Sequence, residues 1–204
     1  MSPIVGVLLS YLAGSIPSAY VAGKLRGVDL RKHGSGNLGA TNVVRVLGLK
    51  IGAVVFLADL LKGFLPVYFL PRYTETLRPE LWALVYGAAA ILGHVKPIFL
   101  LGKGGGKGVA TATGVFLALV FVPMFIAEVV WITVFYFTRY VSLASLLGAA
   151  ILPIAILAWS RDPQSPVFVA SLIIASFVFW THRANIGRLR RGEEHRFVKK
   201  ESTN

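Results

Sequence analysis

Long apolar stretches are the feature that most constrains the fold of this chain, at residues 4–23, 51–70, 81–95, 109–138, 141–159 and 167–180. About 20 apolar residues suffice to cross the hydrocarbon core of a bilayer as a helix. Apolar residues make up 55% of the sequence and mean hydropathy is +0.69, whereas soluble domains have about 45–50% apolar residues even when glycine is counted. The pattern predicts an all-α, polytopic membrane helix bundle.

Charge is distributed unevenly between the apolar stretches. The chain has 21 Lys and Arg against 9 Asp and Glu, and the basic residues gather in segments 24–50, 102–108 and 181–204. Because basic loops stay in the cytoplasm, we place these segments there and the charge-balanced loops 71–79 and 161–166 outside. Residues 1–204 are predicted to form a single integral-membrane domain. Its basic tail, 181–204, carries Arg183, Arg188, Arg190, Arg191, Arg196, Lys199 and Lys200.

The stretch 109–138 is too long for a simple crossing. As one helix it would measure about 45 Å, against a hydrocarbon core of about 30 Å, and a single crossing would put the tail opposite the other basic loops. We therefore predict two re-entrant half-helices that turn near Pro123, with a kink at Pro123 and no reversal as the alternative. Reversal gives about seven helices, with the N-terminus outside and the C-terminus in the cytoplasm.

Two charged residues, Asp59 and Lys62, lie inside the second apolar stretch. Their spacing of three residues puts both on one helix face. A lone charge in lipid costs about 2.5–3.5 kcal/mol on insertion scales, so these residues are expected to pair or to face the protein interior. A structural ion pair and a direct functional role are both consistent with this position. Pro17, in the first stretch, is expected to interrupt its helix.

A short glycine-rich segment, residues 34–42, separates the first two apolar stretches, and Arg45 follows it. Glycines let backbone N–H groups converge on an anion, and a guanidinium suits phosphate. The segment therefore predicts an oxyanion or phosphate site at a membrane surface. Its proposed ligands are Ser35, Gly36, Asn37, Gly39, Thr41, Asn42 and Arg45.

A second glycine-rich segment, residues 102–108, follows the third apolar stretch and is also predicted to bind an anion. Its candidate ligands are Lys103, Gly104, Gly105, Gly106, Lys107 and Gly108. It is not a P-loop, because Gly108 stands where Ser or Thr would reach Mg²⁺. The first segment fits G-x-G-x-x-G, but no strand precedes it. Cysteine is absent from the sequence, and the four histidines lack metal-ligand spacing. We predict no metal and no cofactor.

Three ordered motifs and one shorter segment resemble the bacterial acyl-phosphate:glycerol-3-phosphate acyltransferase family. The first motif runs from Ser35 to Arg45, the second from Gly93 to Thr111 and the third from His182 to Glu194, while residues 139–145 are also similar. The second motif has one residue more between His94 and its Gly-Gly-Lys-Gly core than that family, so either Lys103 or Lys107 takes the role of the family's first lysine.

The resemblance implies an enzyme of the bacterial plasma membrane with its site on the cytoplasmic side. Such an enzyme transfers a fatty acyl group from acyl phosphate to the sn-1 hydroxyl of glycerol 3-phosphate, giving lysophosphatidic acid and phosphate. The two substrates and membrane lipids are then its partners, without nucleic acid, and we expect a monomer. The resemblance implies catalytic roles for Ser35, Arg45, His182 and Asn185, and adds His94 and Ser142 to the substrate-binding residues.

Several points stay open at this stage. If the last helix continues, His182 and Asn185 share one face, while Glu194 is expected to form a structural salt bridge with Arg190 or Arg191. Which loop holds which phosphate is undecided. We hypothesise that the departing phosphate, rather than a histidine, accepts the hydroxyl proton. A phosphate-ester transporter and a lipid-binding membrane scaffold are the alternative functions.

Overall fold

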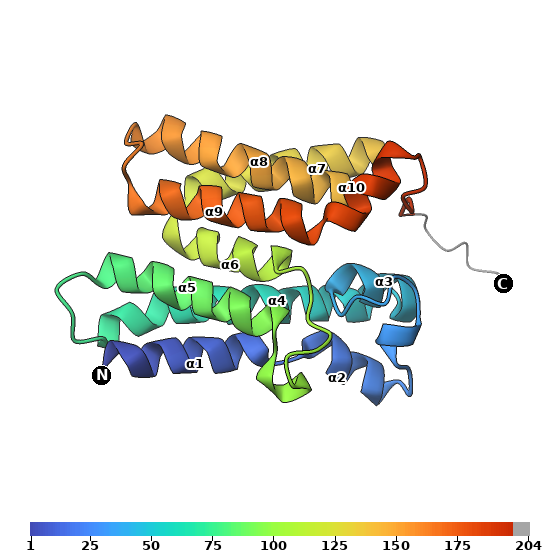
Figure 1. The fold of residues 1–204 in the computed structure, drawn as a ribbon, viewed down its shortest axis with the longest axis horizontal. Helices are drawn as coiled ribbons and strands as arrows, with labels where there is room; N and C mark the ends of the chain where they lie inside the picture. Colours follow the sequence, from blue (N-terminus) through green and yellow to red (C-terminus); the bar gives the residue numbers. More distant parts are fainter. Residues whose placement is uncertain (198–204) are drawn as a thin grey trace. The chain divides into compact units, whose positions relative to one another are not determined.

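The computed structural model describes residues 1–197; Lys199 and Lys200 of the predicted tail lie outside the described residues. Within that range the chain is all-helical (Figure 1), as predicted. The α-helices are α1 (Pro3–Ser15), α2 (Ser18–Leu25), α3 (Ala40–Leu47), α4 (Leu49–Phe69), α5 (Pro79–Val95), α6 (Val109–Leu119), α7 (Phe121–Thr138), α8 (Val141–Ser160), α9 (Pro166–Thr181) and α10 (Arg183–Arg190). Single 3-10 turns span η1 (Leu30–Lys32), η2 (Leu70–Tyr73) and η3 (Ile98–Leu100).

Five helical segments of residues 1–197 are long and apolar enough to cross a membrane. They are Pro3–Leu25, Leu49–Tyr73, Pro79–Leu100, Phe121–Thr138 and Val141–Ser160. A sixth candidate joins α9 to α10 across a 60° bend. The first candidate is broken between α1 and α2 at Pro17, as expected, because proline disfavours the helical conformation of the residue before it.

The structure has the predicted break near Pro123, but three residues before that proline. Helix α6 ends at Leu119 and α7 begins at Phe121, so the joint is Val120. Pro123 is the third residue of α7, where a backbone N–H has no intrahelical acceptor and its loss costs no hydrogen bond. Helix α6, with 11 residues, is about 16 Å long and matches a half-helix. Helix α7 has 18 residues and is long enough to span, which corrects its predicted length. The reversal itself stays a prediction.

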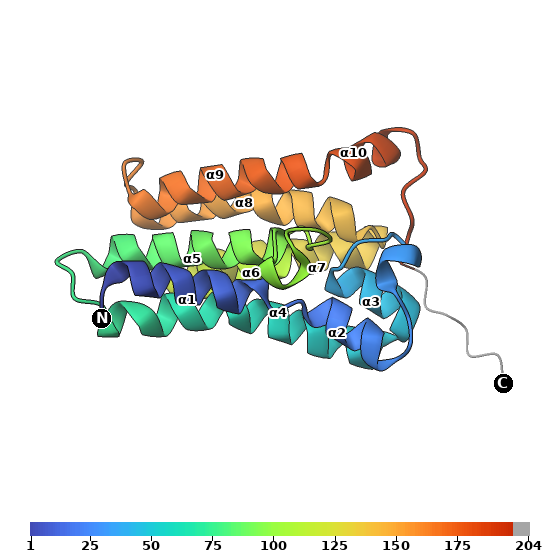
Figure 2. The ribbon, with the colours of Figure 1, turned by 60° about the horizontal axis from the view of Figure 1, so that its bottom comes forward.

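Contacts divide the chain into two compact units, Met1–Phe121 and the residues from Val122 onward. In the first unit α1, α4, α5 and α6 lie side by side (Figures 1 and 2). Glycines set their spacing. A Cβ on Gly14 of α1 would collide with the Ala90 carbonyl of α5, and one on Gly63 of α4 would collide with the Thr111 carbonyl of α6. Small residues at such contacts let membrane helices pack closely.

A small apolar core holds the end of the first unit that carries the glycine-rich segments. Ala19 of α2, Leu30 of η1, Val43 of α3 and Val55 of α4 pack together there with Leu38. Helix α3 is strongly amphipathic, so its apolar side covers this core and its polar residues lie beside the loop. The core fixes the position of residues 33–42 relative to α4.

The second unit is built on α7, α8 and α9, joined by short connections (Figure 1). Trp131 of α7 donates from Nε1 to the Ser145 hydroxyl of α8, 3.2 Å away. Helix α10 and residues 191–197 return to the α7–α8 connection, where the Phe197 N–H donates to the Arg139 carbonyl at 2.8 Å. This arrangement brings the segment 139–145 next to the third motif.

Candidate functional site

Asn42 organises the first glycine-rich loop from inside. Its Oδ1 accepts the Ser35 N–H at 2.8 Å, and its Nδ2 donates to the carbonyls of Leu30 and His33 at 3.2 and 3.1 Å. The side chain is buried, with 1% exposure. Predicted as a substrate ligand, Asn42 uses both polar atoms to close the loop around Ser35.

Ser35 and Arg45 are both less buried than Asn42. Ser35 is exposed and Arg45, on α3, is partly buried. Gly39 caps α3, so the first N–H groups of that helix, around Ala40 and Thr41, face the loop. Helix N-termini carry partial positive charge and bind anions. Phosphate binding by this backbone and Ser35 stays a prediction, and Arg45 lies on the helix that begins there.

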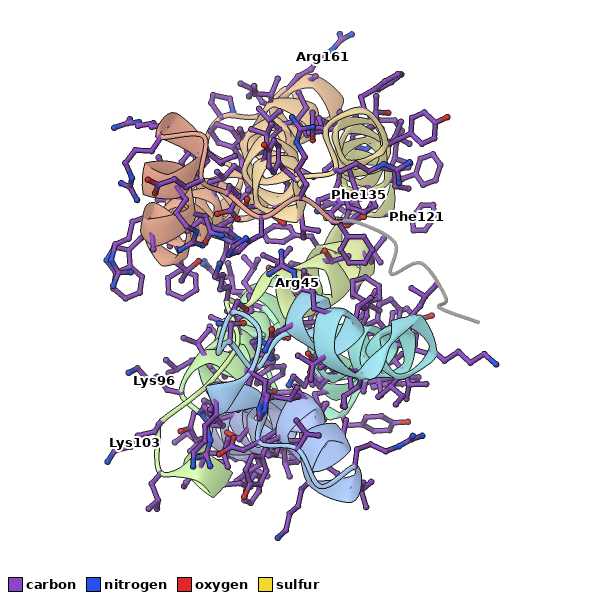
Figure 3. The ribbon with its side chains drawn as sticks, turned by 90° about the vertical axis from the view of Figure 1, so that its right-hand side faces the viewer. Arg45, Lys96, Lys103, Phe121, Phe135 and Arg161 are labelled. Carbon is purple, nitrogen blue, oxygen red and sulfur yellow. The ribbon has the colours of Figure 1, made fainter. Side chains whose placement is uncertain are left out.

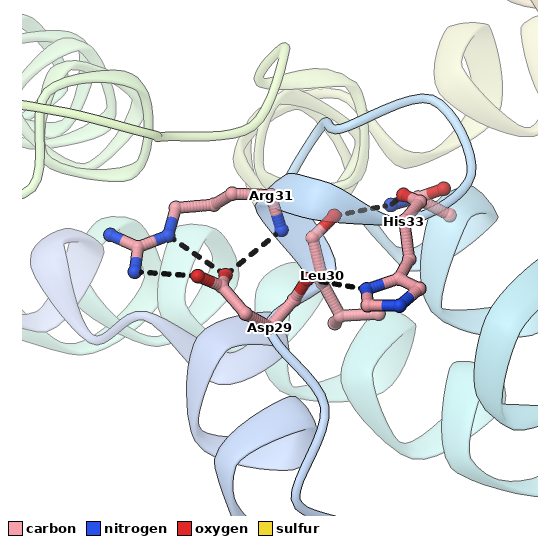
Figure 4. Close-up of polar contacts among 5 residues, drawn as sticks. Asp29, Leu30, Arg31 and His33 are labelled. Carbon is pink, nitrogen blue, oxygen red and sulfur yellow. Dashed lines mark hydrogen bonds and ion pairs between the residues drawn. The ribbon is translucent and has the colours of Figure 1, made fainter.

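An ion pair borders the same loop. Arg31 donates from Nε and Nη2 to the two carboxylate oxygens of Asp29, each at 2.9 Å, while His33 Nδ1 lies 2.9 Å from the Asp29 carbonyl (Figure 4). The hydrogen bonds from Arg31 lower the pKa of Asp29 to about 2. Asp29 is consequently ionised at neutral pH and holds the Arg31 guanidinium at the loop's base.

The second glycine-rich loop packs on the end of α5 and touches the first. A Cβ on Gly105 would collide with the Val95 carbonyl, and a Cβ on Gly106 with Nε2 of His94. A Cβ on Gly104 would lie 3.5 Å from Cδ1 of Leu38 and 3.6 Å from Cδ of Arg31. The fold thus brings the two predicted anion loops side by side at one end of the first unit.

The two candidate lysines of this loop differ in their surroundings. Lys103 is exposed and points away from the helices (Figure 3). Lys107 is partly buried, two residues before α6 begins. A partly buried ammonium next to a helix N-terminus interacts more strongly with an anion than an exposed one, because less water screens it. This difference favours Lys107.

Beneath the second loop lies a buried polar cluster made of Asp59, Lys62 and His94. Lys62 Nζ is 2.8 Å from Asp59 Oδ1, and His94 Nδ1 is 3.7 Å from the same oxygen. Lys62 also donates to the Ile16 carbonyl, 2.9 Å away, at the break between α1 and α2. The expectation that Asp59 and Lys62 pair inside the protein is confirmed. His94, predicted to bind substrate, is 6% exposed and supports the loop from below.

Glu194 gathers the polar groups of the second unit. Its Oε1 accepts from the Ser142 hydroxyl at 2.8 Å and from Asn185 Nδ2 at 2.6 Å, and its Oε2 accepts from Arg188 Nε at 2.7 Å. Burial raises the pKa of Glu194, but these hydrogen bonds together leave the pKa below its ordinary value. The predicted structural salt bridge is confirmed, although its partner is Arg188 rather than Arg190 or Arg191.

His182 occupies the bend between α9 and α10. Its Nδ1 lies 2.8 Å from the Val178 carbonyl, so Nδ1 carries the proton and Nε2 is left as an acceptor in the neutral ring. The helix does not continue through His182, which corrects the expected spacing between His182 and Asn185 on one helix face. The apolar run ends at Trp180 and the following arginines favour water, so the chain turns there.

Comparisons with known proteins agree with one another. A sequence profile of the family described as glycerol-3-phosphate acyltransferase matches residues 4–192. A glycerol-3-phosphate acyltransferase of Fusobacterium nucleatum is 45% identical over 192 residues, covering 94% of this chain and 96% of the relative. One from Aquifex aeolicus is 44% identical, covering 94% and 97%. The chain belongs to the glycerol-3-phosphate acyltransferase family.

Solved structures of the glycerol-3-phosphate acyltransferase family share this fold. The glycerol 3-phosphate form of PlsY (YgiH), an integral membrane glycerol 3-phosphate acyltransferase, has a TM-score of 0.88 and 39% identity, covering 96% of both chains. The lysophosphatidic acid form has a TM-score of 0.85 and 38% identity, covering 96% and 95%. This protein is accordingly a multi-span integral membrane protein, in line with its apolar helices.

Some residues of this glycerol-3-phosphate acyltransferase family member gained importance with the fold. Arg31 contacts both loops but looked in the sequence like ordinary cytoplasmic charge. The charge of Asp59 is evident from the sequence, but its proximity to His94 depends on the packing of α4 against α5. Asp59 stands out in the sequence because placing a charged residue of an apolar stretch in a membrane costs free energy. A comparable signal for Arg31 is lacking, because basic residues are common in such loops.

Proposed function

We propose that this protein transfers a fatty acyl group from acyl phosphate to the sn-1 hydroxyl of glycerol 3-phosphate, giving lysophosphatidic acid and inorganic phosphate. The family supports glycerol 3-phosphate as the acceptor. Two features support acyl phosphate as the donor in this proposal. Two anion loops suit two phosphate groups, and apolar helices suit the acyl chain of an amphiphile.

The observation that carries the proposal is the contact between the two glycine-rich loops. Each loop leads into a helix, α3 after Gly39 and α6 after Gly108. Both helices present unpaired N–H groups at their starts. Two phosphates held in these adjacent loops would bring their substrates within reach of each other.

We assign Arg45 and Lys107 as the principal cations of the site, with Ser35 and the N–H groups of both loops as neutral donors. Arg45 offers a planar fork that suits two phosphate oxygens. Gly36, Gly39, Gly104 and Gly105 supply accessible backbone, whereas Gly108 is buried. Thr41, at the start of α3, and Asn37 complete the first loop. Lys103, being exposed, would attract anionic substrates from a distance.

The reaction needs one bond formed and one broken. The glycerol 3-phosphate hydroxyl oxygen attacks the acyl carbonyl carbon, and the bond from that carbon to the phosphate oxygen breaks. The departing phosphate takes the hydroxyl proton and leaves as inorganic phosphate. The loops hold both substrates in reach of each other and stabilise charge on the leaving phosphate. Ser35 orients a substrate and forms no acyl-enzyme.

The third motif contributes to substrate positioning in this proposal. His182 Nε2 is an acceptor suited to the acceptor hydroxyl or a phosphate O–H. Asn185 and Ser142 act through Glu194, which fixes their orientation. The site faces the cytoplasm of a bacterial plasma membrane, with the N-terminus outside, and the enzyme works as a monomer without metal or cofactor.

Purified protein with palmitoyl phosphate and labelled glycerol 3-phosphate tests the proposal. We expect labelled 1-acyl lysophosphatidic acid and an equal amount of phosphate, in the absence of coenzyme A and acyl carrier protein. Palmitoyl coenzyme A serves as the matched donor control and should give no product. Product from the coenzyme A ester alone, or uptake of glycerol 3-phosphate into vesicles without turnover, contradicts the proposal.

A further inference from the structure

We propose that Asp59 is a positioning residue, which acts through His94 to set the second glycine-rich loop at the height required for phosphate binding. The inference rests on the proposed function, in which this loop holds a phosphate. Asp59 lies on α4, His94 on α5 and Gly106 in the loop above them, so one buried side chain connects a membrane helix to a surface loop.

The loop side of this connection is a steric fit between His94 and Gly106. A Cβ on Gly106 would collide with Nε2 of the imidazole. The φ angle of Gly106 lies outside the left-handed region that favours glycine. Space, rather than backbone conformation, therefore requires glycine here. The imidazole acts as a floor on which the loop rests immediately before Lys107.

The helix side of the connection is the Asp59 carboxylate. His94 Nδ1 lies 3.7 Å from Asp59 Oδ1. A carboxylate on this side favours the tautomer with its proton on Nδ1, which leaves the Nε2 lone pair toward the loop. Lys62, 2.8 Å from the same carboxylate and bound to the Ile16 carbonyl, balances its charge. The imidazole therefore lies beside an ion pair that carries no net charge, and the carboxylate attracts its Nδ1–H.

The loop is sensitive to this orientation because its neighbours are backbone atoms. Gly105 rests on the Val95 carbonyl, so the loop has little room to move toward α5. A rotated imidazole would lift Gly106 and with it Lys107. Misplacement of a binding group by about 1 Å can cost about a hundredfold in rate, so loss of the Asp59 contact should weaken substrate binding.

The contact between His94 and Gly106 can be tested with two substitutions, of which the second relieves the steric clash that the first creates. Gly106→Ala should raise KM for a phosphate substrate at least about tenfold, since one charge-assisted bond is lost. His94→Asn keeps a polar group at the position of Nδ1 and removes the ring edge at Nε2. The double variant should therefore bring KM from the Gly106→Ala value back to about that of His94→Asn alone. Gly105→Ala is the matched control, because its Cβ meets backbone and His94→Asn cannot relieve it.

Melting temperature gives the same test without catalysis. Gly106→Ala should lower the melting temperature, and the addition of His94→Asn should recover most of the loss, whereas Gly105→Ala should show no recovery. A Gly106→Ala/His94→Asn protein as impaired as Gly106→Ala in both measurements overturns the proposal. If the parent lacks acyl-phosphate-dependent activity, the proposed function fails, yet the melting series still decides whether His94 supports the loop.

Two charge-free pairs test Asp59 itself. Asp59→Asn/Lys62→Met keeps a polar oxygen beside Nδ1, while Asp59→Leu/Lys62→Met removes it. Both avoid a lone buried charge. We expect the double variant with Asp59→Asn to keep the KM of the parent protein. The double variant with Asp59→Leu should raise KM about tenfold. In both double variants kcat should stay within twofold of the parent value. Equal KM values for the two pairs, with a change in melting temperature alone, would make Asp59 merely structural.

Discussion

Two buried polar residues, Asn42 and Glu194, hold the polar contacts of their respective loops. Each makes three hydrogen bonds to groups far from it along the chain or in a neighbouring turn. Buried polar atoms need partners, because an unpaired one costs about 1–3 kcal/mol. The hydrogen bonds of Asn42 and Glu194 therefore help to fix the positions of Ser35 and Asn185.

Arg45→Lys tests whether the guanidinium fork matters beyond its charge. Lysine keeps the charge but loses the planar pair of donors. We expect kcat/KM to fall about tenfold or more, because one charge-assisted hydrogen bond contributes about 1.5–3 kcal/mol. The matched control is Arg26→Lys, an exposed arginine of the same basic connection, which should behave like the parent. Near-normal kinetics for Arg45→Lys would mean that Arg45 serves only as a positive charge that sets the membrane topology.

Glu194 predicts a pH dependence of stability. Its folded pKa lies below the ordinary value of 4.5, so its ionised form adds stability above pH 4.5 that is lost as the pH falls through the folded pKa. Glu194→Gln should lower the melting temperature at pH 7, and the difference from the parent should narrow as pH falls below 4.5. Thermal melts in detergent from pH 7 to pH 4 measure this. A constant difference across that range would contradict it.

The sequence indicates which residue types could form the candidate site, but not which contacts their side chains make. Ser35, Arg45 and the glycines stand out because glycine-rich polar loops are unusual between apolar stretches. Asn42, Ser142 and His94 were predicted to bind substrate, yet their polar atoms face the protein. Spacing along a chain cannot distinguish a side chain that points into a loop from one that points out of it, since the difference depends on long-range partners such as Glu194 for Ser142.

At the scale of helices, glycine contacts determine how closely α4 and α6 approach. Gly63→Ala should destabilise the protein by about 1–3 kcal/mol, because its Cβ would meet the Thr111 carbonyl and overpack the interface. Gly148→Ala in α8 is the control, since its Cβ would meet neighbours at 3.5 Å or more. Alanine there should be neutral or stabilise by up to about 1 kcal/mol. Equal melting temperatures for both variants would show that α6 can shift away from α4.

The length of the apolar stretches was enough to predict which parts of the chain form helices. The residue at which each helix ends depends on the residues around that position. Pro17 ended α1 as expected. Pro123 did not end a helix, because proline fits the first turn of α7 as well as it fits a break, and the sequence offers both choices. The identity of Val120 does not predict that a helix ends there. The bend at His182 is not predicted by the sequence either, because neither proline nor glycine occurs between Trp180 and Asn185.

At the scale of the whole molecule, topology follows from the distribution of charge. The chain lacks cysteine, so single cysteines can be introduced without background labelling. We expect Gln164→Cys to react with an impermeant maleimide from outside intact cells, and Arg190→Cys only after the membrane is opened. Both positions are exposed. Reaction of Gln164→Cys only after the membrane is opened, with Arg190→Cys reacting in intact cells, would exclude the reversal between α6 and α7.

The internal pairing of Asp59 with Lys62 has a consequence for how the chain enters the membrane during synthesis. The two charges lie on one helix, three residues apart, so α4 carries its own counter-ion before α5 and α6 have left the ribosome. A neutral pair lowers the cost of placing α4 in lipid compared with two separate charges. Helix α6, too short to cross alone, would then find α4 already in place as its docking surface.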